Sequence, residues 1–317
     1  GGGLGIQTVG FSWGGDRGRS FEQMRGTVSA SLGVSMCGVS LIGHDLGGYR
    51  GDASPEARKV YIRGVQYATF SPSFHDHGSA PGPWEQDAYG RDNYAFYSRV
   101  RYNILPYLYH YVRESHKTGV PLMRALVLHH PTDRNTFTIE DEYYLGENLL
   151  IAPVVTDSDT RTIYLPSGQW IDFWNNGIFS GEQQINYFAP LNRIPVFAKA
   201  GTIFPLELNN ALQLGGSFSH EQKNNLVLAF RFFEGPDADL DFYGKNDIHI
   251  SKKTFNDQIL FSVKNIFQNF ALIADNVSPR SVVVNGKRIK KIQKDKFAYV
   301  NEGWMFDTEQ SQTLIKI

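Results

Sequence analysis

Three short polar segments carry residue types that can transfer protons or bind ligands. They are Trp13-Gly14-Gly15-Asp16, His44-Asp45 on a glycine-rich turn, and His75-Asp76-His77 before a further glycine. A carboxyl group can donate or accept a proton, and an imidazole can do the same or bind a metal ion. These segments therefore indicate either acid–base catalysis or a metal site.

Each segment also has a structural explanation. Asp16 precedes a predicted helix, where a carboxylate stabilises the positive end of the helix dipole. Asp45 before Leu46-Gly47-Gly48 fits an Asx-type turn. A zinc hydrolase using His75, His77 and a carboxylate is a further alternative, but no third ligand stands at a recognisable spacing.

The composition excludes several classes of protein. The 317 residues include 31 Lys and Arg against 32 Asp and Glu, a balance that argues against nucleic-acid binding through phosphate neutralisation. A hydrophobic content of 41% supports a substantial core and excludes wholesale disorder. No run of 18 apolar residues occurs, so no membrane-spanning segment is predicted. The single cysteine, Cys37, can form no intrachain disulfide.

Residues 1–145 alternate short apolar runs with long helical patterns, which is typical of β/α units around a parallel sheet. Ser20-Phe21-Glu22-Gln23 is a predicted capping box. Pro106 is expected to kink the third helix and Gly119 to cap it. The expected elements are helices over residues 20–33, 54–70 and 92–117 and strands over residues 36–42 and 120–128.

Beyond residue 146 the pattern changes to short alternating β runs separated by turn dipeptides such as Asn176-Gly177 and Asn285-Gly286. This pattern is typical of antiparallel sandwiches, and a polar stretch over residues 215–225 marks a boundary. The catalytic groups of β/α barrels lie at the carboxyl ends of different strands, where Asp16 and Asp45 are expected.

Five strings, in the same order, resemble glycoside hydrolase family 31, which contains retaining α-glucosidases, α-xylosidases and α-galactosidases. The resemblance is specific over residues 1–205 and only general beyond residue 215. The matching strings are Phe11-Ser12-Trp13-Gly14-Gly15-Asp16, Gly43-His44-Asp45-Leu46-Gly47-Gly48-Tyr49, His77-Gly78-Ser79 with Pro83-Trp84, Leu105-Pro106-Tyr107-Leu108-Tyr109, and residues 146–154 read as G-E-N-L-L-I-A-P-V.

The resemblance implies an α/β plus all-β fold, in which the C-terminal part of a (β/α)8 TIM barrel is followed by two antiparallel β-sandwich domains. The expected domains are residues 1–145 for the barrel part, 146–212 for the proximal β-sandwich and 213–317 for the distal β-sandwich.

The resemblance also implies a role for each residue. Asp16 matches the general acid/base, which protonates the leaving oxygen and later deprotonates the attacking water. Trp13 forms an apolar wall beside the sugar, and Asp45 and His77 hydrogen-bond to its hydroxyls. His75 stands where many members carry arginine, which changes the contacts to the far side of the sugar. The other expected substrate-binding residues are the rim aromatics Tyr49 and Trp84.

The nucleophilic aspartate of this family precedes the acid/base, in a motif such as W-x-D-M-N-E or D-G-x-E that is not found in this sequence. Retention requires two carboxylates about 5 to 5.5 Å apart. We therefore expect a C-terminal fragment, inactive by itself and unstable because part of a barrel leaves open sheet edges. The start, Gly1-Gly2-Gly3-Leu4-Gly5, does not read as a signal peptide, and the compartment stays undecided.

The complete protein is expected to hydrolyse terminal α-linked glycosyl residues with retention, or to transfer them to another sugar. The alternative is an inactive carbohydrate-binding or structural protein on the same scaffold, in which Asp16, Asp45 and Trp13 bind sugar without turnover. The expected partner is an oligosaccharide or α-glycoside, and two-carboxylate chemistry needs no cofactor or metal. The particular sugar, the acceptor and the oligomeric state do not follow from the sequence.

Overall fold

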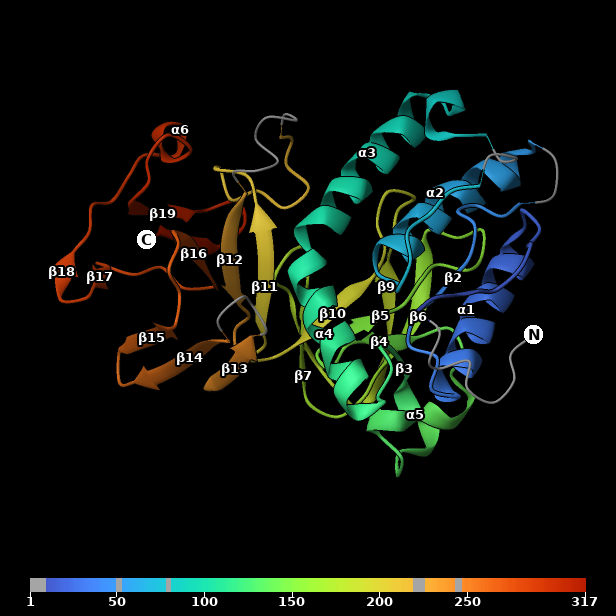
Figure 1. Ribbon diagram of the computed structural model, residues 1–317, viewed down its shortest axis with the longest axis horizontal. Helices are drawn as coiled ribbons and strands as arrows, with labels where there is room; N and C mark the ends of the chain where they lie inside the picture. The colour runs from blue at the N-terminus through green and yellow to red at the C-terminus, as the bar shows by residue number, and fades with distance from the viewer. Residues whose placement is uncertain (1–9, 50–52, 78–80, 219–225, 243–246) are drawn as a thin grey trace. The chain divides into compact units, whose positions relative to one another are not determined.

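The computed structural model describes residues 10–49, 53–77, 81–218, 226–242 and 247–317 (Figure 1). The chain forms two compact units. The first comprises residues 1–101, 111–168 and 180–197, and the second comprises residues 102–110, 169–179 and 198–317. The three domains expected from the sequence stay a prediction, and most of the polar stretch at 215–225 lies outside the described residues.

The first unit begins with two parallel strands joined by a helix. Strand β1 (Ser12–Trp13) pairs with β2 (Ile42–Gly43), and α1 (Phe21–Met36) connects them. Ser20 caps α1 as predicted, because its side chain accepts a hydrogen bond from the Gln23 amide at 3.3 Å. This β/α arrangement is the barrel-type architecture expected from the sequence.

The strand expected over residues 36–42 is wrong for most of its length. Helix α1 continues to Met36, and the chain then turns at Gly38, whose φ of 84° is left-handed. Only Ile42–Gly43 is extended and paired. The apolar run Met36-Cys37-Gly38-Val39 has no helix-breaking residue before the glycine, so the helix extends through its start.

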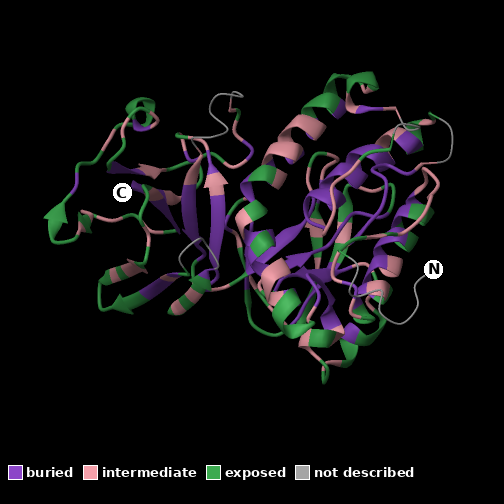
Figure 2. Ribbon diagram, in the orientation of Figure 1, coloured by how far each residue is buried: buried purple, intermediate pink, exposed green. Residues whose placement is uncertain are grey.

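Helix α2 (Pro55–Thr69) starts at its predicted cap, where Ser54 Oγ accepts from the Ala57 amide at 3.1 Å. Proline occupies the first helical position, where its missing N–H costs nothing. Figure 2 shows α2 buried over most of its length, and residues 60–69 are all buried.

The single helix expected over residues 92–117 is wrong, because two helices occupy this stretch. Helix α3 (Ala88–Asn103) ends one residue before α4 (Leu105–Thr118) begins. Pro106 lies at the second position of α4 and lacks the N–H that would continue the helix from α3. The helix is therefore interrupted at Ile104, close to the proline that was expected to kink it. Gly119 ends α4 with a φ of 77°, and its amide donates to the Ser115 carbonyl, which confirms the predicted cap.

The rest of the first unit is rich in strands. The expected strand over residues 120–128 is wrong in its second half, because β3 (Met123–Ala125) leads directly into the helical turn α5 (Leu126–His129). Leucine is a good helix former, and the run Leu126-Val127-Leu128 has no strand partner to hold it extended. The antiparallel pairs are β3 with β4 (Tyr143–Leu145), β4 with β5 (Leu149–Ile151), and β6 (Thr160–Leu165) with β9 (Gln183–Phe188).

The second unit is built on a sheet of five strands in the order β11-β12-β16-β20-β19. One pair in it, β12 with β16, is parallel, so the sheet is mixed and not purely antiparallel as expected. The strands are β11 (Ile203–Leu208), β12 (Val227–Phe232), β16 (Phe270–Asp275), β19 (Gly303–Asp307) and β20 (Gln312–Lys316).

A smaller antiparallel sheet of β13 (Ala238–Phe242), β14 (Ile248–Phe255) and β15 (Gln258–Lys264) belongs to the same unit. The predicted hairpin at Asn285-Gly286 joins β17 (Val283–Val284) to β18 (Lys287–Arg288), with both turn residues at positive φ. The remaining elements of the chain are η2 (Pro83–Glu85), η3 (Arg134–Thr138), β7 (Gln169–Asp172), β8 (Ile178–Ser180), β10 (Val196–Lys199) and α6 (Lys294–Phe297).

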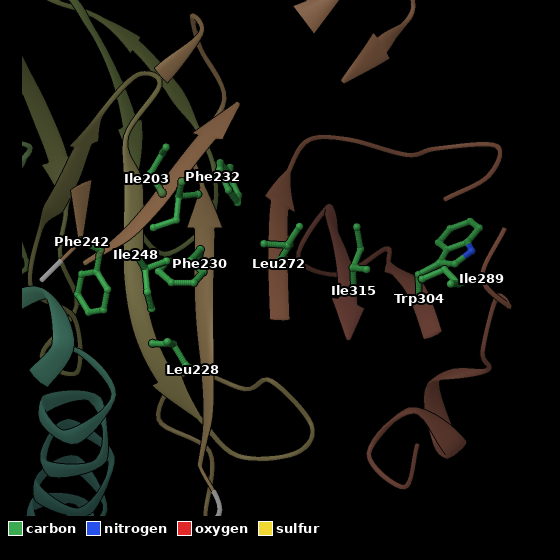
Figure 3. Packing of buried hydrophobic residues seen from close by; sticks show 11 residues of the cluster. Ile203, Leu228, Phe230, Phe232, Phe242, Ile248, Leu272, Ile289, Trp304 and Ile315 are labelled. Atoms are coloured by element: carbon green, nitrogen blue, oxygen red, sulfur yellow. The ribbon is translucent and has the colours of Figure 1, made fainter. Parts of the chain in front are cut away.

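The hydrophobic core of the second unit is formed by buried residues from both of these sheets (Figure 3). Phe230 is fully buried, and the Phe242 ring lies edge-on to it with the ring centroids 5.8 Å apart. Trp304 and Ile289 belong to the same cluster and lie next to each other, away from Phe230 and Phe242. In the described part of the chain, no helix is long and apolar enough to cross a membrane.

Replacing Arg63 in α2 by methionine is expected to destabilise the first unit by about 3 to 5 kcal/mol, the usual cost of breaking a buried charged network. Burial lowers the pKa of the Arg63 guanidinium to about 10, so it stays charged at neutral pH. It donates to the carbonyl oxygens of Ser158, Ala189, Pro190 and Arg193 at 2.7 to 3.2 Å, and to Gln66 Oε1 at 3.3 Å.

The measurement is the urea midpoint of the complete protein, compared with that of Arg58→Met on the same helix. Arg58 pairs with Asp87 at the surface, where such a pair contributes about 0 to 1 kcal/mol. Equal midpoints for the two variants would contradict the role given to Arg63.

Candidate active site

The carboxyl ends of β1 and β2 bring two of the predicted segments to one edge. The amide of Gly14 donates to the Gly43 carbonyl at 2.9 Å, so the two chains stay paired one residue beyond β1. Asp16 follows β1 by three residues, and His44 and Asp45 follow β2 directly. Because the strands are parallel, these side chains leave the same edge of the pair, where β/α barrels carry their catalytic groups.

Gly14 is required by the close approach of His44. A Cβ atom at position 14 would lie 1.8 Å from His44 Cε1, well inside any tolerable contact. The backbone that carries Asp16 therefore lies against the imidazole next to Asp45. This packing explains why glycine precedes the predicted acid/base.

His44 has a structural role in the site. Its Nε2 lies 2.9 Å from Ser31 Oγ on α1, and the side chain is buried. Burial lowers the pKa of His44 to about 4, with smaller contributions from the nearby charges of Arg17 and His75. The imidazole is therefore neutral at neutral pH and holds the β2 turn against α1.

This burial predicts an acid-sensitive fold. Between the ordinary pKa of 6.5 and the folded-state pKa of about 4, the unfolded chain binds a proton that folded His44 does not. The free energy of unfolding therefore falls as the pH falls through that window, by about 1.4 kcal/mol for each unit between the two pKa values. His44→Gln is expected to flatten this dependence in urea titrations at pH 4 to 7.

His116→Gln is the matched control, because His116 is exposed near the end of α4. A wild-type pH dependence that His44→Gln leaves unchanged would contradict the assignment.

The third predicted segment lies against the second. The Leu46 amide donates to the His75 carbonyl at 3.1 Å, which joins the two loops. His75 Nε2 then lies 3.2 Å from Asp45 Oδ1, and His75 Nδ1 lies 2.7 Å from Ser73 Oγ. The Asp45 side chain is 2% exposed, and neither of its oxygens accepts a hydrogen bond of good geometry from the described residues.

His77 meets Tyr49, since their rings lie edge to face with centroids 4.5 Å apart. The Tyr49 amide donates to the Arg17 carbonyl at 2.8 Å, next to the predicted acid/base. Asp76 fixes the backbone of His77 by accepting from its amide at 2.9 Å, and it also accepts from Tyr61 Oη at 3.2 Å. Burial raises the pKa of Asp76, and these two hydrogen bonds oppose the shift.

The structure therefore joins most of the predicted site residues but not all. Asp45, His75, His77 and Tyr49 are linked by the contacts above. Trp13 is 51% exposed at the end of β1, and Asp16 is half-buried beyond it. Trp84 is 77% exposed in η2, and within the described residues no ring contact, hydrogen bond or ion pair links it to the others. Two residues of the third matching string, Gly78 and Ser79, lie outside the described residues.

A cavity of about 30 Å³ adjoins His44 and Asp45 between β2, α1 and α2. This volume admits a water molecule and not a sugar ring. This cavity is therefore too small to enclose a sugar by itself. In the part of the chain that the structure describes, no group of three His, Cys, Asp or Glu side chains is placed to hold a metal ion.

Sequence reasoning missed the serines that hold the two histidines. Ser31 contacts His44, and Ser73 contacts His75. Ser31 belongs to a polar stripe with Thr27 and Ser35 at a spacing of four, all buried on α1. Such a stripe on a buried face signals hydrogen-bonding partners in the core. No comparable signal marks Ser73.

Two family models match the chain and together cover more than half of it. Residues 1–111 match the model described as the TIM-barrel domain of glycosyl hydrolases family 31. Residues 119–204 match the model described as the glycosyl hydrolase family 31 C-terminal domain.

Individual relatives extend this similarity. An isomaltosyltransferase of Sporosarcina globispora is 33% identical over 99% of this chain, and Alpha-glucosidase 2 of Bacillus thermoamyloliquefaciens is 34% identical over 64%. The solved structure of the cycloalternan-forming enzyme from Listeria monocytogenes, in complex with a pentasaccharide substrate, superposes with a TM-score of 0.89 over 97% of this chain at 29% identity. The chain spans 26% to 31% of the length of these three proteins.

Proposed function

Because the chain belongs to glycosyl hydrolase family 31, we propose that the complete protein is a retaining α-glycosidase that acts on terminal α-linked sugars. The observation that carries the proposal is the common edge reached by Asp16, after β1, and by Asp45, after β2. One carboxyl group can thus face the scissile bond while the other binds the same sugar. The chemistry that results is general acid–base catalysis on a glycosidic oxygen.

In this proposal Asp16 protonates the leaving oxygen and then deprotonates the attacking water. The two glycines before it and its half-buried position are consistent with a side chain that serves both solvent and sugar. Trp13, half-exposed three residues earlier, supplies an apolar wall for the sugar ring.

Asp45 accepts hydrogen bonds from sugar hydroxyls in the proposed complex. Burying a carboxylate without good hydrogen bonds lowers the stability of the fold, and donors from sugar hydroxyls would supply the missing hydrogen bonds to Asp45. His77 serves the same sugar, with Tyr49 beside it, and Trp84 forms part of an outer rim. His75 is also a predicted binding residue, and its contacts with Ser73 and Asp45 indicate a more specific role.

The nucleophile is proposed to come from a part of the complete protein other than these 317 residues. A carboxylate about 5 to 5.5 Å from Asp16 is needed to form the covalent glycosyl-enzyme. We accordingly expect the isolated chain to be inactive, and we expect an aspartate on an upstream strand of the complete protein.

The test is the anomeric outcome of hydrolysis by the complete protein. Proton NMR during cleavage of 4-nitrophenyl α-glycosides should show the α-anomer of the free sugar first, before mutarotation produces the β-anomer. The β-anomer appearing first would contradict retention. Sugar binding without turnover would favour the inactive carbohydrate-binding alternative.

Transfer to a second sugar is the other candidate outcome. The isomaltosyltransferase and the cycloalternan-forming enzyme match 99% and 97% of this chain, including its distal β-rich part, whereas Alpha-glucosidase 2 matches 64%. Transfer results when a sugar hydroxyl, and not water, attacks the covalent glycosyl-enzyme. Mass spectrometry of products at high oligosaccharide concentration separates the two, because transfer yields oligosaccharides longer than the substrate.

A further inference from the structure

The two ring nitrogens of His75 contact Asp45 and Ser73. His75 Nε2 lies 3.2 Å from Asp45 Oδ1, while Ser73 Oγ lies 2.7 Å from His75 Nδ1. Serine, histidine and aspartate therefore form one continuous line, which we call the Ser73–His75–Asp45 chain. A hydroxyl that donates to Nδ1 leaves the ring proton on Nε2, where it faces the carboxylate.

The serine end of this chain is fixed to the fold. Ser71 Oγ donates to the Ser73 carbonyl at 2.8 Å, and Ser71 is buried. Gly43 on β2 permits the approach, because a Cβ there would lie 2.5 Å from Ser73 Oγ. The Phe11 ring lies edge-on to His75 with centroids 6.0 Å apart. The imidazole is thus held from two sides and has little freedom to turn toward a ligand.

The aspartate end has no other described support. Apart from His75, the charged or titratable groups near Asp45 are Arg17, His44 and Asp76. Arg17 lines the same cavity as Asp45, and His44 is occupied by Ser31. Asp45 is nearly inaccessible and has no hydrogen bond of good geometry from the described residues. A buried carboxylate in that state takes its orientation from the polar groups close to it, and His75 Nε2 lies 3.2 Å from Asp45 Oδ1.

We propose that His75 is a positioning residue that orients Asp45 for the sugar and does not contact the sugar itself. This inference rests on the proposed function, since Asp45 is the sugar-binding carboxylate there. It also gives a physical meaning to histidine at this position: Ser73 sets the tautomer and Nε2 directs the carboxylate.

The test uses three variants of the complete protein. His75→Leu removes the polar group next to Asp45 and is expected to raise KM for a 4-nitrophenyl α-glycoside about tenfold, with kcat changed less than threefold. His75→Gln places an amide N–H near the position of Nε2 and should recover most of the loss. Ser73→Ala should raise KM by a smaller factor.

Double variants separate positioning from direct contact. In an Asp45→Asn background, His75→Leu should have no further effect on KM if it acts through Asp45. A further tenfold increase in that background would mean that His75 touches the sugar and would overturn the proposal. Equal KM values for wild type and His75→Leu would overturn it as well. Ser98→Ala is the control for serine removal, because Ser98 is half-buried on α3 and its hydroxyl donates to the Ala95 carbonyl of the same helix.

The outcome is distinguishable from failure of the proposed function. Calorimetry can compare the affinity of wild type and His75→Leu for 1-deoxynojirimycin without any turnover. The role of His75 can therefore be tested even if the protein binds sugar but does not cleave it, because His75→Leu should still lose affinity. A wild-type protein that neither cleaves α-glycosides nor binds this sugar analogue contradicts the proposed function, and the role of His75 falls with it. Normal wild-type cleavage with unchanged His75 variants contradicts the role of His75 alone.

Discussion

Asp16→Ala is expected to lower kcat/KM by about 10³-fold for substrates with poor leaving groups, within the 10²- to 10⁴-fold range of general acid–base catalysis. The loss should be much smaller for 2,4-dinitrophenyl α-glycosides, because an acidic phenol leaves without protonation. The measurement is a comparison of kcat/KM across leaving groups of graded acidity. Asp16 lies beyond β1 at the edge shared with Asp45, and this position is the physical reason for the prediction.

The control for this prediction is Glu22→Gln. Glu22 is an exposed acid in the first turn of α1, six residues from Asp16, and its removal is expected to leave turnover unchanged. If Asp16 only complemented the helix dipole, both variants would lose stability slightly and neither would lose activity selectively. A uniform loss across all leaving groups would argue against proton donation by Asp16.

Asp45→Ala is expected to lower kcat/KM by about 10²-fold or more, because each hydrogen bond to a charged group contributes about 1.5 to 3 kcal/mol. The carboxylate is almost inaccessible and lacks good hydrogen bonds among the described residues, so sugar hydroxyls would be its main partners. Unlike Asp16→Ala, this loss should not depend on the leaving group.

Asp92→Asn, an exposed change on α3, is the control. An Asp45→Ala variant with the kinetics of Asp92→Asn would remove Asp45 from the site. A less stable Asp45→Ala variant with little loss of activity would instead support the alternative of an ordinary turn residue.

Features set by neighbouring residues were predictable from the sequence. Ser20 and Ser54 cap their helices, and Asn285-Gly286 forms its hairpin, because each depends on a side chain or φ value within a few residues. The end of α1 was not predictable, since competing local patterns decide it, and at Pro106 the sequence predicted a disruption of the helix but not its division into two helices. The parallel pairing of β12 with β16 joins residues about 40 apart, and no local pattern specifies it.

In the candidate site too, the residues marked by local sequence were predicted, and a residue that depends on tertiary contacts was not. The spacing of Asp16 and Asp45 after apolar runs indicated strand ends, and the structure places both there. Ser73 was not found, because its importance comes from the approach to His75 and from the absence of a side chain on Gly43. The place of Trp84 stays a prediction: its indole is 77% exposed, and within the described residues no ring contact, hydrogen bond or ion pair links it to the other site residues.

Azide rescue of Asp16→Ala in the complete protein tests the acid/base assignment most directly. With the base removed, azide should attack the glycosyl-enzyme from the face that water normally uses. We predict faster turnover of 2,4-dinitrophenyl α-glucoside with rising azide, and an α-glucosyl azide as the product. No acceleration, or a β-glucosyl azide, would show that Asp16 is not the acid/base of a retaining enzyme.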